Sequence, residues 1–228
     1  MRRVVELVAD RGSFFELAPL FGRSQVTGFA RLSGQPVGIF ASDCMHSGGA
    51  MTAEGARKVR RFVETCDAFH LPIVSFVDEP GFMIGPEAER AATIRFGMEA
   101  HFAVQQTRVP WAAVVLRKSF GVAQGIHYGP GATVFAWPSM QSGALPVESG
   151  VALAFGREIA AAPDPEARRR ELEEEMGAAQ SVFPRAEEFG VHDLLDPRRT
   201  RPALCAWVEE IQTELRQLTG PRSYSMRP

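Results

Sequence analysis

Several residue types that point to particular classes of protein are scarce in this chain of 228 residues. Asparagine is absent, and only Lys58 and Lys118 accompany the arginines among its 25 basic residues. This bias is typical of a GC-rich bacterial genome, so the abundance of arginine does not by itself indicate a phosphate-binding surface. Because the net charge is −2, the composition indicates neither a nucleic-acid partner nor an anionic membrane surface.

Cysteines and long apolar runs are equally scarce. Cys44, Cys66 and Cys205 are odd in number and widely spaced, which suits neither a disulfide framework nor a metal-binding knuckle. No apolar run approaches the roughly 20 residues of a membrane span. The first residues, Met-Arg-Arg-Val-Val-Glu, do not lead into an apolar signal segment. We therefore expect a cytoplasmic protein with no membrane span and no metal site.

Conventional catalytic side chains do not form a recognisable motif. There is no histidine motif for a metal and no G-x-S-x-G nucleophile elbow, and residues 121–125 lack the Gly-Lys-Ser/Thr end of a phosphate-binding loop. Asp78 and Glu79 are candidates for general acid–base groups, but an aspartate shortly before Pro80 is also a common turn former. His127 stands close enough to a glycine turn to reach an active site, although hydrogen bonding is the simpler role.

Apolar periodicity predicts an alternation of strands and helices. After a short helix and a turn that end near Leu20, strands are predicted at residues 26–32 and 36–41 (a hairpin around Ser33-Gly34), 73–77, 112–116 and 134–138. Helices are predicted at residues 52–69, 87–107, 163–180 and 202–218, with a short one after Gly121. The charged helix at 163–180 is expected to be solvated and to contain ion pairs. Such alternation with short connections favours an α/β domain with a mainly parallel sheet.

The two most informative segments are strand-to-helix junctions at residues 73–82 and 112–125. Each is a short apolar run that ends in a glycine-bearing turn. Such a junction presents backbone N–H groups at the N-terminus of a helix, where a developing negative charge is stabilised. This arrangement can form an oxyanion hole that needs no catalytic side chain. The alternative is that both are ordinary buried strands whose glycines serve only the turns.

Many short segments, in order along nearly the whole chain, carry a resemblance to a known family. They are residues 14–17, 26–31, 55–62, 66–69, 76–82, 95–97, 117–121 and 136–138. From Phe14 to about Leu215 the chain resembles the C-terminal domain of the carboxyltransferase (beta) subunits of biotin-dependent acyl-CoA carboxylases, of the propionyl-CoA and methylcrotonyl-CoA type. The resemblance implies a crotonase-like (ClpP/crotonase) ββα superhelix. It divides the chain into an N-terminal interdomain-type helix (1–20), the crotonase-like domain (21–218) and a tail (219–228).

The resemblance also implies an activity that does not need catalytic side chains. Members of the family move a carboxyl group between carboxybiotin and an acyl-CoA, through enolates that backbone amides stabilise. Each such N–H donor contributes roughly 3 kcal/mol of transition-state stabilisation. Carried over to this sequence, the catalytic residues are Gly121, which makes the turn, and Val122 and Ala123, whose N–H groups would bind the biotin oxygen. Cofactor binding is implied for the first junction, at Gly81, Phe82 and Gly85.

Gly125 is implied to contact the acyl substrate. Propionyl-type relatives resemble one another in having aspartate at this position, so Gly125 is expected to leave space for an acyl group larger than propionyl. The expected preference is roughly 10- to 200-fold, because one methylene-sized contact contributes about 1–3 kcal/mol. Replacing Gly125 by aspartate is then predicted to shift the ranking toward propionyl-CoA.

Three departures from the family pattern bear on these assignments. Relatives have glycine or alanine at Val122, and a β-branched residue cannot easily take a positive φ, so the hole requires a right-handed conformation there. The segment between Ala123 and Ala136 is a few residues shorter than usual. Relatives typically read Met-Gly-Ala where this chain has Leu145-Pro146-Val147. The resemblance therefore implies no particular acyl-CoA.

The resemblance implies several partners. Biotin is expected on a biotin carboxyl carrier protein or a biotin carboxylase subunit, and not covalently on this chain, because neither lysine lies in a Met-Lys-Met context. Family subunits have a second, N-terminal crotonase-like half that binds most of the CoA. Here that half is expected on another chain, or removed by truncation. The apolar surface that it leaves exposed predicts a homo-oligomer or a complex with the missing half.

Two alternatives are open. A biotin-dependent acyl-CoA decarboxylase or transcarboxylase would use the same site, which is microscopically reversible. A catalytically silent assembly subunit would keep the fold but would have lost the oxyanion hole through Val122. The φ angle at Val122 separates this last alternative from the others.

Overall fold

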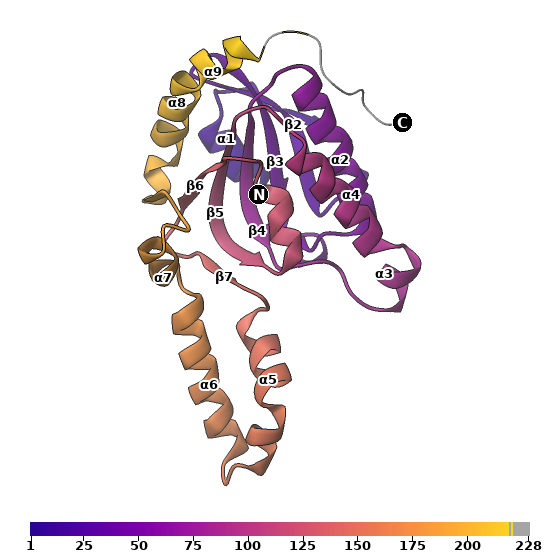
Figure 1. Ribbon diagram of the computed structural model, residues 1–228, viewed down its shortest axis with the longest axis vertical. Coiled ribbons are helices and arrows are strands. Elements are labelled where there is room, and N and C mark those ends of the chain that lie inside the picture. Colours follow the sequence, from indigo (N-terminus) through magenta and orange to yellow (C-terminus); the bar gives the residue numbers. More distant parts are fainter. Residues whose placement is uncertain (219, 221–228) are drawn as a thin grey trace.

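The computed structural model describes residues 1–218 and 220, and Figure 1 shows their arrangement around one sheet. Among these residues the sheet has eight strands in the order β1-β2-β3-β4-β5-β6-β8, with β7 paired to β5. The strands are β1 (Phe15–Leu17), β2 (Gln25–Leu32), β3 (Gln35–Ser42), β4 (Ile73–Glu79), β5 (Trp111–Phe120), β6 (Thr133–Ala136), β7 (Gln141–Gly143) and β8 (Asp193–Leu194). The α-helices are α1 (Arg2–Val8), α2 (Ala53–Ala68), α3 (Pro86–Arg90), α4 (Thr93–Gln105), α5 (Val147–Ala161), α6 (Pro165–Gln180), α7 (Val182–Glu187), α8 (Thr200–Glu210) and α9 (Gln212–Gln217). Short 3₁₀ helices are η1 (Ser47–Gly49), η2 (Val122–His127) and η3 (Pro197–Arg199).

The sheet is mixed. The pairs β1–β2 and β2–β3 are antiparallel, whereas every pair from β3 onward is parallel. The predicted hairpin is confirmed: Ser33 and Gly34 connect β2 to β3 with φ angles of 48° and 78°, the left-handed conformation that a tight two-residue turn needs. The sequence pattern does not predict β1, because three residues are too few to show a strand period.

One face of the sheet is covered by α2 and α4 (Figure 1). The helix α2 begins after Thr52, whose Oγ1 accepts a 3.0 Å hydrogen bond from the N–H of Gly55. Its apolar residues, such as Val59, recur on the side that faces the sheet. Successive side chains of a strand point to opposite faces, so Phe40 of β3 packs in this cluster while Ile39 packs in the cluster on the other face.

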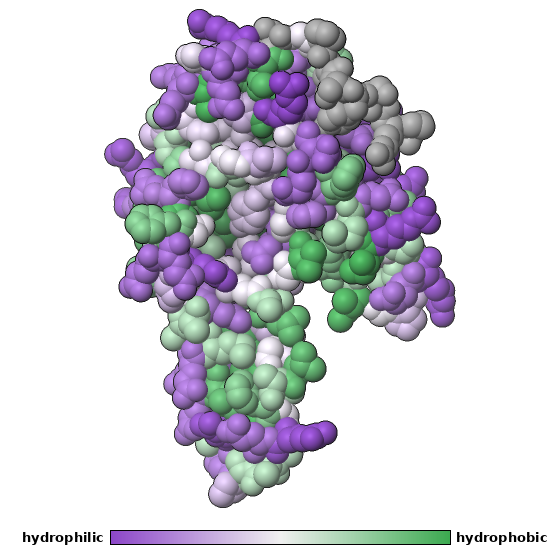
Figure 2. All heavy atoms as spheres, viewed as in Figure 1, coloured by the Kyte–Doolittle hydropathy of each residue, from purple (hydrophilic) through white to green (hydrophobic). Residues whose placement is uncertain are grey.

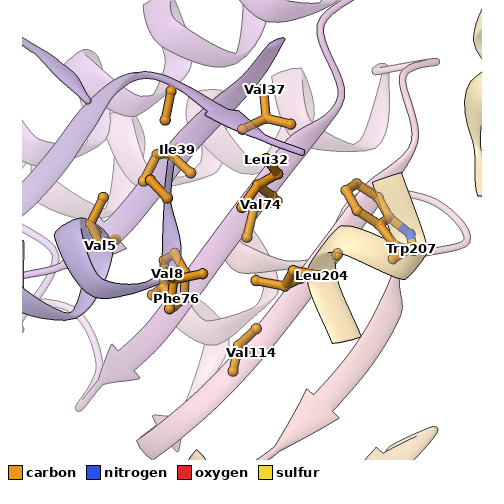
Figure 3. Close-up of a cluster of buried hydrophobic side chains, with 14 of the residues drawn as sticks. Val5, Val8, Leu32, Val37, Ile39, Val74, Phe76, Val114, Leu204 and Trp207 are labelled. Atoms are coloured by element: carbon orange, nitrogen blue, oxygen red, sulfur yellow. The ribbon is translucent and has the colours of Figure 1, made fainter. Parts of the chain in front are cut away.

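The other face of the sheet is covered by α1 and α8, as Figure 3 shows. Val5 and Val8 of α1 share this core cluster with Leu204 and Trp207 of α8. The segment 1–20 therefore belongs to the same core as the rest of the chain, and β1 extends the same sheet. The expected tail at 219–228 lies outside the described residues apart from Gly220.

Two of the predicted helices are each divided in the structure. The helix predicted at 87–107 is divided into α3 and α4, because Ala92 between them has the left-handed conformation, with φ 56° and ψ 42°. Neither glycine nor proline stands at this break, so residue types alone could not locate it. The helix predicted at 202–218 is α8 followed by α9, which meet at Ile211.

A helical hairpin of α5 and α6 projects beyond the sheet (Figure 1). The predicted ion pairs of α6 are confirmed: Arg168 lies 2.7 Å from Glu158 of α5 and 2.9 Å from Glu171. The helix is not solvated on every side, because Leu172 packs against Val151 of α5. The sequence pattern does not predict α5, which is the next element along the chain after β7.

Candidate active site

The two glycine-bearing junctions lie at one edge of the sheet. The strands β4 and β5 are parallel neighbours, with Val77 opposite Val115 and Glu79 opposite Ser119. Because the carboxyl ends of parallel strands meet at the same edge of a sheet, the turns that follow both strands share that edge.

The second turn ends β5 and begins η2. Gly121 has φ 63° and ψ −163°, a conformation that essentially only glycine adopts, and its N–H donates a 3.0 Å hydrogen bond to the carbonyl of Gly143. The first N–H groups of a helix have no carbonyl partner within it. Val122 and Ala123 occupy these positions, and neither N–H has a hydrogen-bond acceptor among the described residues.

Val122 adopts a conformation that its β-branched side chain tolerates. It lies inside η2 and is not among the described residues with a positive φ. Its side chain is 62% exposed, whereas Ala123 is fully buried. The turn therefore has two unpaired N–H donors at the start of η2, one on an exposed residue and one on a buried residue.

The first turn follows β4 and leads into α3. It contains Gly81, Phe82 and Gly85, and its two glycines have φ angles of 130° and 108°. The turn is hydrogen-bonded to the loop before α2: the N–H of Met51 donates to the carbonyl of Gly81 (3.0 Å), and the N–H of Met83 donates to the carbonyl of Met51 (2.9 Å). The three residues expected to bind the cofactor thus lie on one backbone-anchored loop.

Gly125 does not face empty space. A Cβ at this position would lie 2.8 Å from Cε1 and 3.1 Å from Nδ1 of His101 on α4. The expectation that Gly125 leaves room beside it is therefore wrong, because the imidazole of His101 fills that space. The absence of a side chain at residue 125 allows η2 and α4 to approach closely.

Gly125→Ala is expected to destabilise the chain by about 1–3 kcal/mol, because the added methyl group overlaps the His101 ring and one element must move. Urea unfolding measures this change. His101→Ala removes the ring, so adding Gly125→Ala to that variant should cost much less. An equal cost in both backgrounds would show that this contact is not the cause.

Asp78 ties β4 to β5. Its carboxylate accepts hydrogen bonds of 3.1 and 3.0 Å from Nε and Nη2 of Arg117 and one of 3.2 Å from the N–H of Lys118. The hydrogen bonds between Asp78 and the guanidinium group, together with the negative charge of Asp78, raise the pKa of Arg117. The side chain of Asp78 is 8% exposed. Asp78 is therefore an ion-pair partner that holds the two junctions together and not an exposed acid–base group.

Glu79 points the other way, into a buried polar cluster that the sequence pattern does not predict. Its Oε1 accepts hydrogen bonds from the N–H groups of Met51 (3.1 Å) and Gly81 (3.2 Å). Its Oε2 lies 3.3 Å from Nε2 of Gln25 and 3.5 Å from Nε2 of His127. The signal available in the sequence was the acidic pair at residues 78 and 79, because adjacent strand residues face opposite sides of a sheet.

His127 approaches this cluster from η2. Its Nε2 lies 3.3 Å from Oγ of Ser42, and its ring stacks on Phe40 with centroids 4.2 Å apart. Its carbonyl accepts a 2.7 Å hydrogen bond from Oγ of Ser75. In a nucleophilic triad the serine and the carboxylate contact different ring nitrogens. Here Ser42 and Glu79 both lie at Nε2, so the geometry gives His127 a hydrogen-bonding role.

The stability of the chain is expected to depend on pH through Glu79. Burial raises the pKa of its carboxyl above the ordinary 4.5, while His127 and the N–H groups of Gly81 and Met51 act in the opposite direction. A carboxyl with a raised folded pKa contributes stability that is fully present below the unfolded pKa and is lost as pH rises through the folded pKa. The free energy of unfolding should therefore fall across that window by up to about 1.4 kcal/mol per pH unit relative to Glu79→Gln. Urea unfolding at a series of pH values checks this, and parallel curves would contradict it.

Residues 1–218 and 220 offer neither a metal site nor a membrane-spanning helix. No group of three or more His, Cys, Asp or Glu side chains in this part of the chain could hold a metal ion. None of its helices combines the length and apolar character needed to cross a membrane.

Comparison with known proteins assigns the chain to a family. Residues 1–223 match the carboxyl transferase domain family. The chain is 36% identical over 208 residues to the propionyl-CoA carboxylase carboxyltransferase subunit of Haloferax mediterranei, across 89% of this chain and 40% of that protein. It is 33% identical over 218 residues to the methylmalonyl-CoA carboxyltransferase 12S subunit of Propionibacterium freudenreichii, across 94% of this chain and 42% of that protein. The chain therefore belongs to the carboxyl transferase domain family, as the resemblance predicts.

Solved structures of this family share the fold. The transcarboxylase 12S structure with methylmalonyl-CoA and methylmalonic acid bound matches with a TM-score of 0.88 at 32% identity, over 100% of this chain and 43% of that one. The β subunit of geranyl-CoA carboxylase from P. aeruginosa matches with a TM-score of 0.81 at 25% identity, over 99% of this chain and 44% of that one. The predicted crotonase-like fold is confirmed. The chain spans less than half the length of each of these relatives.

Proposed function

We propose that this chain supplies the biotin-side half of a carboxyl transferase site, which moves a carboxyl group between carboxybiotin and an acyl-CoA. The observation that carries this proposal is the pair of unpaired N–H groups of Val122 and Ala123, which follow a glycine-only turn at Gly121. Membership of the carboxyl transferase domain family supports the reaction class.

The donors present fit the ureido group of biotin. When bound, carboxybiotin supplies the carboxyl group and an oxygen that gains negative charge as that group leaves. Two N–H groups at a helix N-terminus stabilise such an oxygen without reorganising during the reaction. The exposure of Val122 leaves the turn accessible to a group carried by another protein. We assign the loop with Gly81, Phe82 and Gly85 to hold the cofactor beside this turn.

The acyl-CoA side of the site is proposed to come from a second crotonase-like half. Large apolar side chains are exposed on the loop after β4 and on or next to α5, namely Met83, Ile84, Leu145 and Leu153. Figure 2 shows apolar surface on the α5–α6 hairpin and, across the gap from it, on the main body. Apolar patches of this kind mark interfaces. We therefore propose a complex with a second crotonase-like half or a homo-oligomer. The solved structure of transcarboxylase 12S is a hexamer assembly.

Carboxyl exchange in a reconstituted complex tests the function. The chain is combined with the polypeptide that supplies the N-terminal half and with a biotinylated carrier protein, and assembly is checked by light scattering. Label in the transferable carboxyl group of a carboxylated acyl-CoA is expected to reach the carrier only when this chain is present. An assembled complex that transfers no label would contradict the proposal.

The biotin is proposed to be carried by a biotin carboxyl carrier protein or a biotin carboxylase subunit. Streptavidin blotting of the purified chain should therefore be negative, with the biotinylated carrier as the positive control. Biotin attached to Lys58 or Lys118 would contradict this division of labour. We propose a cytoplasmic location, which the three unpaired cysteines support.

A transcarboxylase or decarboxylase is the second candidate, because the similarity to transcarboxylase 12S favours the same site run in either direction. Exchange assays started from each side distinguish these directions. The conformation of Val122 argues against a catalytically silent subunit, since both N–H donors keep their place at the start of η2.

A further inference from the structure

The buried polar cluster of Ser42, Glu79 and His127 joins the first junction to the end of η2, the short helix that begins in the second junction. Glu79 ends β4, and its Oε1 accepts the N–H of Gly81 in the first turn at 3.2 Å. His127 ends η2, the helix that begins at the second turn with Val122. The 3.5 Å contact between Glu79 Oε2 and His127 Nε2 therefore joins segments that are 48 residues apart in the sequence.

The contacts of Glu79 extend across several elements. Its carboxyl oxygens accept from Gln25 in β2, from the backbone of Met51 before α2 and from the backbone of Gly81. With His127, four separate segments converge on one carboxyl group. Glu79 therefore connects several elements of the fold and does not stabilise only its own strand.

The cluster is closed from water. The side chains of Glu79 and His127 are both 0% exposed, and Phe40 covers one face of the imidazole. Nδ1 of His127 has no hydrogen-bond partner among the described residues, whereas Nε2 faces oxygens of Ser42 and Glu79. A buried N–H without an acceptor is costly, so we place the ring proton on Nε2. In this dry setting water cannot replace a lost partner, so the loss of one partner is expected to move the attached turns.

We propose that Glu79 and His127 are positioning residues whose buried contact fixes the end of η2, and through this short helix the turn before it, relative to the Gly81 turn. A change in the backbone position of one turn is then expected to change the position of the other. The catalytic consequence rests on the proposed function, because a displacement of about 1 Å in a site of this kind costs on the order of 100-fold in rate. The coupling of the two turns itself does not rest on that function.

Amide hydrogen exchange of the purified chain, resolved by NMR, tests the coupling. His127→Met removes the donor and is expected to speed exchange at Gly81 by roughly fivefold to tenfold, the equivalent of one lost hydrogen bond. Glu79→Gln is expected to speed exchange of the η2 amides in return. His127→Gln is the matched control, because glutamine has nearly the shape of methionine and keeps an N–H donor. Its exchange at Gly81 should stay close to that of the wild type.

A second control separates coupling from general destabilisation. Thr200→Val removes a buried hydroxyl that accepts from Trp137 at 2.9 Å on the other face of the sheet, and it should leave exchange in both turns unchanged. If each substitution changed the exchange rates only in its own turn, the proposal would be overturned. Equal exchange rates at Gly81 in His127→Gln and His127→Met would also overturn it. If His127→Met does not fold, the NMR signal of the Nε2–H proton of His127 is measured in the wild type and in Glu79→Gln. The contact predicts that Glu79→Gln shifts this signal. An unshifted signal would overturn the proposal.

Kinetics of the reconstituted complex add the catalytic readout. His127→Met should lower kcat more than it changes KM, because donor placement matters most in the transition state, and His127→Gln should recover most of the loss. If the wild-type complex transfers no carboxyl group, the proposed function fails, while the exchange experiment still decides whether the two turns are coupled.

Discussion

Replacing Val122 by proline is expected to lower the kcat of the assembled carboxyl transferase by roughly 10²- to 10³-fold, the usual effect of removing one oxyanion donor. Proline removes the N–H of residue 122 but suits the first position of a helix, where the N–H has no partner within the helix and the fixed φ of proline fits the helical backbone. Gly121 has a ψ of −163°, far from the helical ψ values that a following proline disfavours. The measurement is kcat and KM for carboxyl transfer in the reconstituted complex.

Val122→Ala is the matched control for this experiment. It removes the exposed side chain but keeps the N–H donor, so its kcat should remain close to that of the wild type. The proline variant should also unfold at nearly the wild-type urea concentration. If proline and alanine lowered kcat equally, the N–H of Val122 would not be a donor to the transition state.

Leu204→Ala is expected to reduce the free energy of unfolding by about 2–5 kcal/mol, as is usual for truncating a buried leucine. Leu204 is 0% exposed and packs between α8 and the sheet, in the cluster that also contains Val5 and Val8 of α1 (Figure 3). The loss is expected because the two ends of the chain together cover this face. Urea unfolding followed by circular dichroism measures it.

Leu20→Ala provides the comparison, because Leu20 is 88% exposed and its truncation should change stability by no more than about 0.5 kcal/mol. If Leu204→Ala reduced the free energy of unfolding no more than Leu20→Ala does, the packing of α8 against the core would not stabilise the chain. The same result would favour treating residues 1–20 as a segment separate from the rest of the domain.

Much of the local structure was predictable because short-range rules determine it. Ser33 and Gly34 favour a tight turn, and Thr52 supplies a side-chain acceptor where α2 begins. The break at Ala92 was not predictable, since alanine favours a helix and only its surroundings hold it in the left-handed conformation. The same limit applies to β1, whose three residues gain their strand conformation by pairing with β2.

In the candidate site, too, features set by neighbouring residues were predictable and those set by distant contacts were not. The glycine-bearing turns at residues 81 and 121 were visible in the sequence, because glycine is needed where the backbone takes a positive φ. The partners of their neighbours were not visible. Gly125 lies against His101, and Glu79 lies against His127, in pairs that are far apart along the chain and follow no helix or strand period.

The sequence by itself determined the order of the main strands and helices, the glycine-bearing turns that follow β4 and β5, and the family to which the chain belongs. Only the tertiary structure decided that Asp78 is an ion-pair partner, that Glu79 is buried, and that the space beside Gly125 is occupied. Backbone preferences and side-chain periodicity act over a few residues, so they can be read from neighbouring positions. Burial and hydrogen-bond pairing depend on which distant segments meet in space.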